Sequence, residues 1–209
     1  MAITYPLSLP SAAGVRGITL RAANVVAVAE SPFTFRQQVI KHPGERWEAS
    51  VTLPPMQRPD AEAWVAFLLA LKGRAGTFLL GDPSSTGPRG ALSSGTVQIR
   101  TEVAAGASAL ALKGLPASTT GALLPGDFLQ LGAAGTASLH KVLLPVDADA
   151  SGHGTAEVWP AARRTVPVDE VVVWHNPVGR FRLAGNLQEW QIDVARFYGI
   201  SFDAVEAVA

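Results

Sequence analysis

Hydrophobic and polar residues alternate along residues 46–53, RWEASVTL. The residues between the hydrophobic ones are charged or carry a hydroxyl group. This period of two predicts a β-strand with one buried and one solvated face. Pro54 and Pro55 end the strand, because proline offers no backbone donor to a neighbouring strand. The face predicted to be buried consists of Trp47, Ala49, Val51 and Leu53.

Residues 59–73, PDAEAWVAFLLALKG, follow the period of an α-helix instead. Pro59 suits the first turn, Asp60 lies near the positive end of the helix dipole, and Lys72 and Gly73 mark the last turn and the stop. The spacing of the apolar residues predicts a broad face packed on a sheet. That face consists of Ala61, Trp64, Val65, Leu68 and Leu71, widened by Phe67 and Leu69.

Residues 76–83 predict a short strand, after which residues 84–96 consist mainly of small turn-forming residues. Short apolar runs separated by turn signals then continue to about residue 175, which predicts a small all-β sandwich or barrel without a helix. The runs are TVQIRTEV, SALALKGL, GDFLQLG, SLHKVLLPV, TAEVWPA and EVVVWHNP.

The last part of the chain returns to longer strands. Trp190, Ile192 and Val194 fall on one face, as in the strand at 46–53, so the two strands are expected to be sheet partners. The predicted fold is therefore mainly β. Residues 1–82 and 179–209 would form a discontinuous, belt-like β-sandwich domain with one flanking helix, and residues 83–178 an inserted all-β domain. Insertions succeed at exposed turns whose ends lie close together.

The charge balance argues against binding to nucleic acid. Lys and Arg total 17 in the 209 residues, and Asp and Glu also total 17, so no net field favours polyanions or anionic lipid. Charged residues make up 16%, against about 25% in soluble domains. Small apolar residues take their place, which favours a surface covered by copies or partners. The absence of cysteine excludes disulfides, thiolate nucleophiles and cysteine-ligated metals.

Targeting and membrane signals are not found in the sequence. Residues 1–14 show no basic segment followed by an apolar stretch, as a secretory signal would. The longest unbroken apolar stretch, residues 64–71, is too short to cross a bilayer. We therefore expect a soluble protein without membrane insertion.

The glycine-rich stretch at 73–90, GRAGTFLLGDPSSTGPRG, invites comparison with a phosphate-binding loop. Such a loop lies between a strand and a helix and places a lysine before Ser or Thr. Here the glycines follow the predicted helix and no such lysine is present. The glycines are better interpreted as a helix stop and turn positions.

Residues 147–155, DADASGHGT, match the first half of a calcium-binding loop through Asp147, Asp149 and Ser151. The second half does not match, because the twelfth position, where a bidentate glutamate is required, is Val158. A solvated hairpin tip is the favoured interpretation, since Asp, Ser and Gly suit turns. Calcium remains the alternative, and no cofactor is expected.

Other catalytic signatures fail as well. The four histidines, which show no metal-ligand spacing, are expected mostly in turns or on the surface. No serine has the G-x-S-x-G setting of a nucleophile. Paired carboxylates of a glycosidase can come from distant strands, so Glu48, Asp127 and Glu157 stay candidates by residue type alone. We expect no catalytic residue and no enzyme. The histidines are His42, His140, His153 and His175.

Tryptophans raise the question of carbohydrate binding, in which exposed rings stack on sugars. Three of the five fall on faces assigned to the core. Trp159 and Trp174 therefore remain as candidates for glycan contact.

Residues Trp47–Met56, Ala61–Pro83 and Pro88–Gly90 together resemble structural tail proteins of long-tailed, siphovirus-like bacteriophages, most closely the distal tail protein type. The later stretches LLPGDFLQLG, HKVLLPVDADASGHGTAEVWPAARR and NPVGRFRLAGN resemble the middle and end of the same proteins. The resemblance covers most of the chain and rests on a packing pattern.

This resemblance implies a virion protein at the tail tip, made in the bacterial cytoplasm. Its belt domain would form a homo-oligomeric ring of six subunits that joins the tail tube protein to the hub proteins of the baseplate. The second domain would project toward baseplate parts or a host surface glycan. A carbohydrate-binding adhesion module for the host surface is the alternative function, and a hydrolase ranks third.

Overall fold

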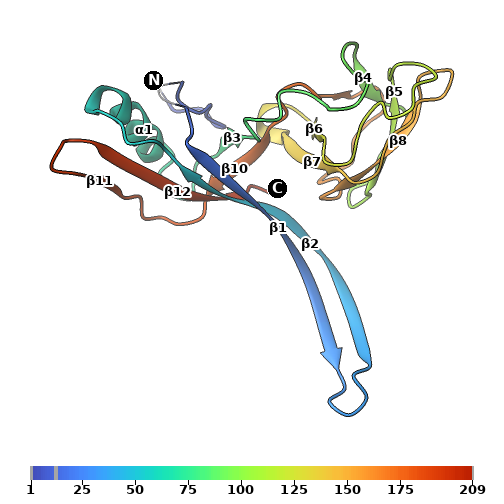
Figure 1. Ribbon diagram of the computed structural model, residues 1–209, viewed down its shortest axis with the longest axis horizontal. Helices are drawn as coiled ribbons and strands as arrows, with labels where there is room; N and C mark the ends of the chain where they lie inside the picture. Colours follow the sequence, from blue (N-terminus) through green and yellow to red (C-terminus); the bar gives the residue numbers. More distant parts are fainter. Residues whose placement is uncertain (1, 12–13, 209) are drawn as a thin grey trace.

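The computed structural model describes residues 2–11 and 14–208 and is mainly β (Figure 1). In this described part, α1 (Arg58–Ala70) is the one α-helix, and no helix is long and apolar enough to cross a bilayer. A short 3₁₀ turn, η1, covers Ala134–Thr136. The strands are β1 (Gly17–Glu30), β2 (Gln37–Thr52), β3 (Phe78–Leu80), β4 (Val97–Ile99), β5 (Ala109–Lys113), β6 (Phe128–Leu131), β7 (Ser138–Val142), β8 (Gly154–Trp159), β9 (Val171–Val172), β10 (Gly179–Leu183), β11 (Trp190–Ile192) and β12 (Tyr198–Glu206).

The first sheet combines strands from both ends of the chain in the order β1-β2-β12-β10-β3, with β11 beside β12. Neighbouring strands are antiparallel, with Ala49 opposite Ala204 and Leu80 opposite Gly179. The β1–β2 hairpin extends far beyond the rest of this sheet as a long two-stranded projection (Figure 1).

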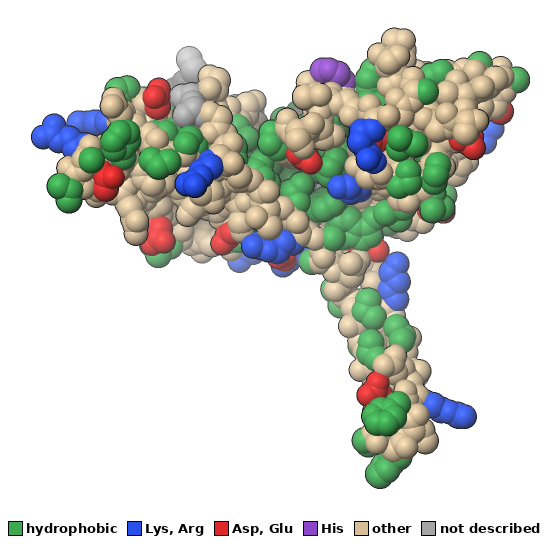
Figure 2. Space-filling model, viewed as in Figure 1, with side chains coloured by type: hydrophobic (Ala, Val, Ile, Leu, Met, Phe, Trp, Pro, Cys, Tyr) green, Lys and Arg blue, Asp and Glu red, His purple; other side chains and the backbone are tan. Residues whose placement is uncertain are grey.

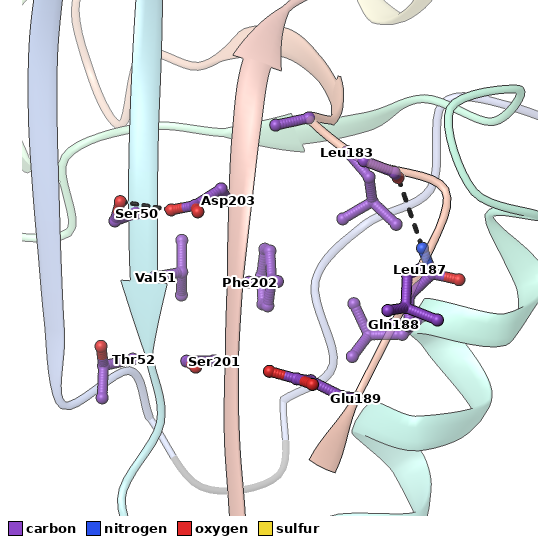
Figure 3. A pocket seen from close by; sticks show the side chains of 13 residues that line it. Ser50, Val51, Thr52, Leu183, Leu187, Gln188, Glu189, Ser201, Phe202 and Asp203 are labelled. Carbon is purple, nitrogen blue, oxygen red and sulfur yellow. Dashed lines mark hydrogen bonds between the residues drawn. The ribbon is translucent and has the colours of Figure 1, made fainter.

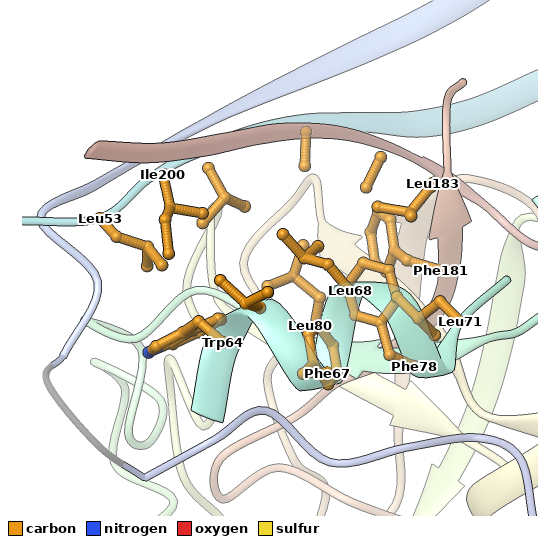
Figure 4. Close-up of a cluster of buried hydrophobic side chains, with 14 of the residues drawn as sticks. Leu53, Trp64, Phe67, Leu68, Leu71, Phe78, Leu80, Phe181, Leu183 and Ile200 are labelled. Carbon is orange, nitrogen blue, oxygen red and sulfur yellow. The ribbon is translucent and has the colours of Figure 1, made fainter. Parts of the chain in front are cut away.

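The alternation predicted at 46–53 is confirmed, because all four residues of the apolar face are buried. They belong to the same hydrophobic core as Trp64 and Leu68 of α1 and Phe78 and Phe181 of β3 and β10 (Figure 4). The predicted helix and most of its buried face are likewise confirmed. Leu69 is the exception: its side chain is 56% exposed, because the helix packs on the sheet with a narrower stripe than predicted.

The end of α1 is fixed by two residues with left-handed backbone. Lys72 and Gly73 have φ angles of 52° and 67°. A Cβ atom on Gly73 would lie 2.9 Å from Oδ1 of Asn186, so glycine suits both the angle and the space. The predicted stop is confirmed, although Lys72 lies just beyond the helix.

The second sheet contains one strand from each of the six predicted runs, in the order β6-β7-β8-β5-β4-β9. Gln130 and Val173 exchange backbone hydrogen bonds of 2.8 and 3.0 Å, so β6 approaches the segment after β9 and the sheet nearly closes into a barrel. Its interior is a second cluster of aliphatic side chains. As predicted, the described residues from about 96 to 175 form no α-helix. The 3₁₀ turn η1 is the one helical turn in this segment.

The predicted partnership between residues 46–53 and 190–194 is wrong. The neighbour of β2 is β12, whereas β11 pairs with β12 alone. Ile192 is 56% exposed and Val194 fully exposed, because β11 lies at the margin of the sheet and pairs with β12 alone. Trp190 is half-buried against the first core, as expected of a core tryptophan.

Candidate assembly interface

The outer part of the β1–β2 hairpin, residues 25–44, is named the arm here. It begins where Asn24 pairs with Glu45, next to a register shift between Asn24 and Val26. Two hydrogen bonds fasten this base to the second sheet. Trp159 donates its Nε1 hydrogen to Oδ1 of Asn24 at 2.9 Å, and the amide of Ala161 donates to Oε2 of Glu45 at 3.0 Å. The arm therefore leaves the body in a defined direction.

Beyond this base the arm has hydrophobic side chains and no core to cover them. Val25, Val28, Val39 and Ile40 are each about half exposed, and hydrophobic atoms continue to the tip (Figure 2). Apolar side chains exposed on a projecting element mark an interaction site. In the arm they lie on both faces of the hairpin.

The outer edge of β1 carries a second signal of assembly. Residues 22–29, AANVVAVA, contain no charged side chain and are rich in β-branched residues. Strand β1 lies at the end of the first sheet, so one row of its backbone groups has no strand partner among the described residues. Proteins normally protect such an edge with charge, proline or a covering element. An unprotected edge of this length favours pairing with another chain.

Below the arm, Trp47 joins the two sheets. Its ring lies 4.6 Å from Trp159 in a T-shaped arrangement and 5.9 Å from Phe128. Its Nε1 hydrogen is donated to the carbonyl of Leu139 at 2.9 Å. The alternation of β2 places Trp47 inward, and the indole then contacts residues of β6, β7 and β8.

A buried ion pair continues this junction. Glu206 is nearly fully buried and accepts two hydrogen bonds from Arg163, one of them 3.0 Å from Nε to Oε1. The backbone amide of Trp47 donates to Oε2 of Glu206 at 3.0 Å. Because Glu206 ends β12 and Arg163 follows β8, the pair links the two sheets. A buried carboxylate requires such partners.

Three of the four histidines are at least partly exposed, in line with the expectation for most of them, but His140 on β7 is fully buried. Its Nδ1 lies 2.6 Å from the carbonyl oxygen of Pro160, and its Nε2 lies 2.8 Å from Oγ of Ser138. The pKa of His140 is lowered from 6.5 to about 4, mainly by burial and also by the charge of Arg163, while the hydrogen bond to the Pro160 carbonyl opposes the shift. The imidazole is therefore neutral at pH 7.

The Ser138–His140 pair does not form a nucleophile site. Both residues are buried, and His140 is oriented by a backbone carbonyl where a catalytic triad has a carboxylate. Substrate therefore has no access to this serine. The pair supports the packing of β7 against residues 159–163.

A groove of about 450 Å³ lies between β12 and the segment after β10 (Figure 3). Asp203 and Glu189 bring carboxylates to it, while Phe202 and Leu183 bring apolar surface. Ser50 donates a hydrogen bond to Asp203 and accepts one from Arg21 at 2.9 Å. These contacts connect β1, β2 and β12, so the polar groups near the groove stabilise the sheet.

The loop between β7 and β8 contains the calcium candidates Asp147, Asp149 and Ser151. Asp147 accepts a hydrogen bond from the amide of Gly121, and Asp149 accepts from the amides of Ser151 and His153. The hydrogen bond from His153 lowers the pKa of Asp149. Both carboxylates thus order turns, as the hairpin interpretation predicted. Within the described residues, His, Asp and Glu do not form a cluster of three suited to a metal; calcium binding stays a prediction.

The two glycan candidates lie in different settings. Trp159 is half-buried, stacks edge-on with Trp47 and is tied to Asn24, so its ring serves the base of the arm. Trp174 is half-buried against the second core, 6.2 Å from the ring of His175. Trp159 and Trp174 thus have different aromatic neighbours, and no ring contact between the two is found among the described residues. Glycan contact through either ring stays a prediction.

The three carboxylate candidates are also separate. Asp127 is buried and accepts hydrogen bonds from the amides of Arg89 and Leu124. Glu48 pairs with Arg46 on β2. Glu157 lies on β8, opposite Ala109 of β5. Asp127 and Glu48 thus have structural partners, and Glu157 lies on a strand of the second sheet.

Neither a family model nor a curated protein matches this chain. Function is therefore argued from the surfaces described above. The main candidate surface is the arm, which the patterns in the sequence did not predict.

Proposed function

We propose that this protein is a structural component of a phage tail tip, which self-assembles into a ring joining the tail tube to the hub of the baseplate. The observation that carries the proposal is the arm: an ordered β-hairpin with apolar side chains and an uncharged open edge, projecting away from both cores. The resemblance to distal tail proteins supplies the tail location and the six-fold ring.

The energetics of the arm support assembly. Isolated two-stranded hairpins are at best marginally stable in water. Burial of apolar area contributes roughly 25 cal/mol per Å², so a partner that covers the arm would stabilise it and remove the exposed edge at once. A second copy is the partner that a ring requires.

A ring also needs two different surfaces on each subunit, because its contacts are heterologous. The second apolar surface lies at the turn around β11, where Leu187, Ile192, Val194 and Phe197 are exposed. The arm projects from the opposite end of the first sheet (Figure 1). Two separated apolar surfaces suit contact with one neighbour and with tube or hub.

We interpret the first sheet and α1 as a discontinuous, belt-like β-sandwich domain, and residues 83–178 as an inserted barrel or sandwich domain. The chain leaves the first sheet after Leu80 and returns at Gly179, and these two residues are paired. A Cβ atom on Gly81 would collide with the carbonyl oxygen of Pro177, so the two connections lie against each other. Closely spaced ends are what an insertion requires.

We propose no catalytic role. The buried polar side chains at the junction are engaged with each other and with backbone groups, as in Glu206 with Arg163 and His140 with Pro160. A reaction would need such groups to face a substrate. The proposed partners are other copies, tube protein and hub proteins, with no cofactor.

The test compares the natural chain with a shortened one in which Asn-Gly replaces residues 27–40. Val26 and Lys41 are paired, so a two-residue turn can close the hairpin there. We expect discrete rings of the natural chain by negative-stain microscopy and sedimentation, and monomers of the shortened chain with unchanged thermal unfolding. Leu143→Ser with Leu144→Ser, exposed residues of the β7–β8 loop, is the matched control and should still form rings. A natural chain that stays monomeric at high concentration, with or without tube protein, would contradict the proposal.

A further inference from the structure

The tip of the arm presents two aromatic rings to solvent. Phe33 is 92% exposed and Phe35 is 74% exposed. The loop that holds them is closed by hydrogen bonds from Phe35 N to Ser31 O at 2.9 Å and from Ser31 N to Arg36 O at 3.0 Å. These bonds fix the position of the rings relative to the arm.

The backbone of Phe35 is strained, with a φ angle of 53°. A bulky residue at positive φ is uncommon, and such strain concentrates at binding and functional sites. The strain at the tip therefore points to a ligand for the aromatic pair, since the ring of Phe35 is mostly exposed on the described part of the chain.

An apolar pocket of about 340 Å³ lies at the two connections between the sheets and is named the hinge pocket. It is open to solvent and has proline and aliphatic walls, with one acidic residue. Its principal lining residues are Leu9, Leu79, Pro83, Pro177, Val178 and Asp82. Small-molecule pockets begin at about 300 Å³, so this one has room for an aromatic side chain.

The arm cannot fill the hinge pocket of its own chain. Its base is tied to Trp159 and Ala161 at the end of strand β8, and the arm extends from there away from β3 (Figure 1). With a rise of about 3.3 Å per residue, the strand from Asn24 to Glu30 carries the tip roughly 20 Å from the base. An arm tip that occupies the pocket therefore comes from another molecule.

Charge complementarity selects the arm tip of a second copy. The side chain of Arg36 has no hydrogen-bond or ionic partner within the described residues, whereas Glu30 beside it is bonded to Gln37. The tip therefore presents two aromatic rings and the guanidinium of Arg36 without an ionic partner, while the carboxylate of Glu30 is held by a neutral amide. At the hinge pocket, Oδ1 of Asp82 accepts hydrogen bonds from the backbone amide and the hydroxyl group of Ser84. Oδ2 of Asp82 has no hydrogen-bond partner among the described residues.

We propose that the arm tip of one copy docks in the hinge pocket of the next, with Phe33 or Phe35 in the apolar pocket and Arg36 beside Asp82. This inference rests on the self-assembly proposed above and names its contact. The groove beside β12 fits less well, because Asp203 and Glu189 would face the rings. The contact joins unlike surfaces, so it closes into a ring when the rotation between copies allows.

The first measurement is self-association by sedimentation. We expect Phe33→Ser with Phe35→Ser to raise the dissociation constant roughly tenfold or more, because exposed aromatic anchors dominate such contacts. Arg36→Asp and Asp82→Arg should each weaken association, and the double exchange should restore it. Glu102→Arg, a reversal at an exposed acidic residue away from the pocket, is the matched control and should have no effect.

The second measurement uses the absence of natural cysteines. Phe35→Cys with Pro83→Cys should give covalent oligomers with a short bismaleimide cross-linker, whereas Phe35→Cys with Leu143→Cys should not. Oligomers of the natural chain, combined with no cross-link and no effect of the tip substitutions, would overturn the docking contact and leave ring assembly standing. A natural chain without oligomers would overturn both.

Discussion

The two halves of the β1–β2 hairpin share a continuous antiparallel ladder but use their side chains differently. In the inner half, β2 alternates between buried and half-exposed residues, and Trp47 packs in the first core with Phe128 and Leu139 of the second sheet. In the arm, side chains on both faces are exposed from Val25 to Pro43, apart from Ser31 at the tip. Backbone pairing is therefore the same, and only the inner half has tertiary packing to support it.

This difference separates stability from assembly. Side chains at the base hold the body together through buried contacts, and side chains in the arm contribute little until a partner covers them. Substitutions in the two halves should then affect different measurements. The following predictions run from the largest expected effect to the smallest.

Trp47→Ala should cost about 3–5 kcal/mol of unfolding free energy, as for large buried aromatic residues. It removes the contacts with Trp159 and Phe128 and leaves the carbonyl of Leu139 without its donor. Chemical denaturation measures the loss. Phe35→Ala in the arm is the control, and an equal loss there would break the comparison.

Glu206→Gln should cost about 3 kcal/mol, because the mostly buried guanidinium of Arg163 would lose its counter-charge. Adding Arg163→Met should recover much of this loss, since the second substitution removes the unpaired charge. A double-mutant cycle by denaturation gives the coupling. Additive losses would show that the ion pair does not connect the sheets energetically.

Acidification should destabilise the junction through His140. The unfolded histidine takes up a proton below its ordinary pKa of 6.5, whereas the folded one does so only near its pKa of about 4. Stability is then complete above pH 6.5 and falls as pH decreases toward 4, by up to about 3 kcal/mol.

The measurement is unfolding free energy between pH 4 and 7.5 for the natural chain and for His140→Gln. The unfolding free energy of the natural chain should fall more steeply with decreasing pH than that of His140→Gln. His153→Gln, in the β7–β8 loop, should show the same pH dependence as the natural chain. Parallel curves for His140→Gln and the natural chain would refute the assignment.

Phe33→Ser with Phe35→Ser should change the unfolding free energy of the dilute monomer by less than about 0.5 kcal/mol, as for other exposed positions. Thermal unfolding at low concentration measures this smallest effect. A loss of several kcal/mol would mean that the tip packs on its own chain. The arm would then contribute to stability, as the inner half of the hairpin does.

Local patterns predicted much of the fold. The helix was found because both its ends and its apolar face carry signals, and the six short runs each contained a strand, since turn residues separate them. Leu69 was misplaced because helical spacing defines the centre of a buried stripe better than its width.

The arm was missed for a physical reason. A strand is predicted from alternating apolar and polar residues, a pattern that arises because one face of the strand is buried in a core. Residues 25–44 pack on no core in the described structure, so apolar and polar residues do not alternate regularly there. The uncharged run AANVVAVA was the available signal. The neighbour of β2 and the burial of His140 depend on contacts between distant segments, which spacing along the chain does not encode.

The pairing of Leu80 with Gly179 means that about a hundred residues enter and leave at a single seam of the first sheet. A genetic exchange between those two codons would substitute one outer module for another without rethreading any strand of the body. The new module would need to offer a carbonyl and an aromatic surface to Trp47, and a cation to the buried Glu206. Diversity at the periphery can thus be acquired in one recombination step while the body keeps its architecture.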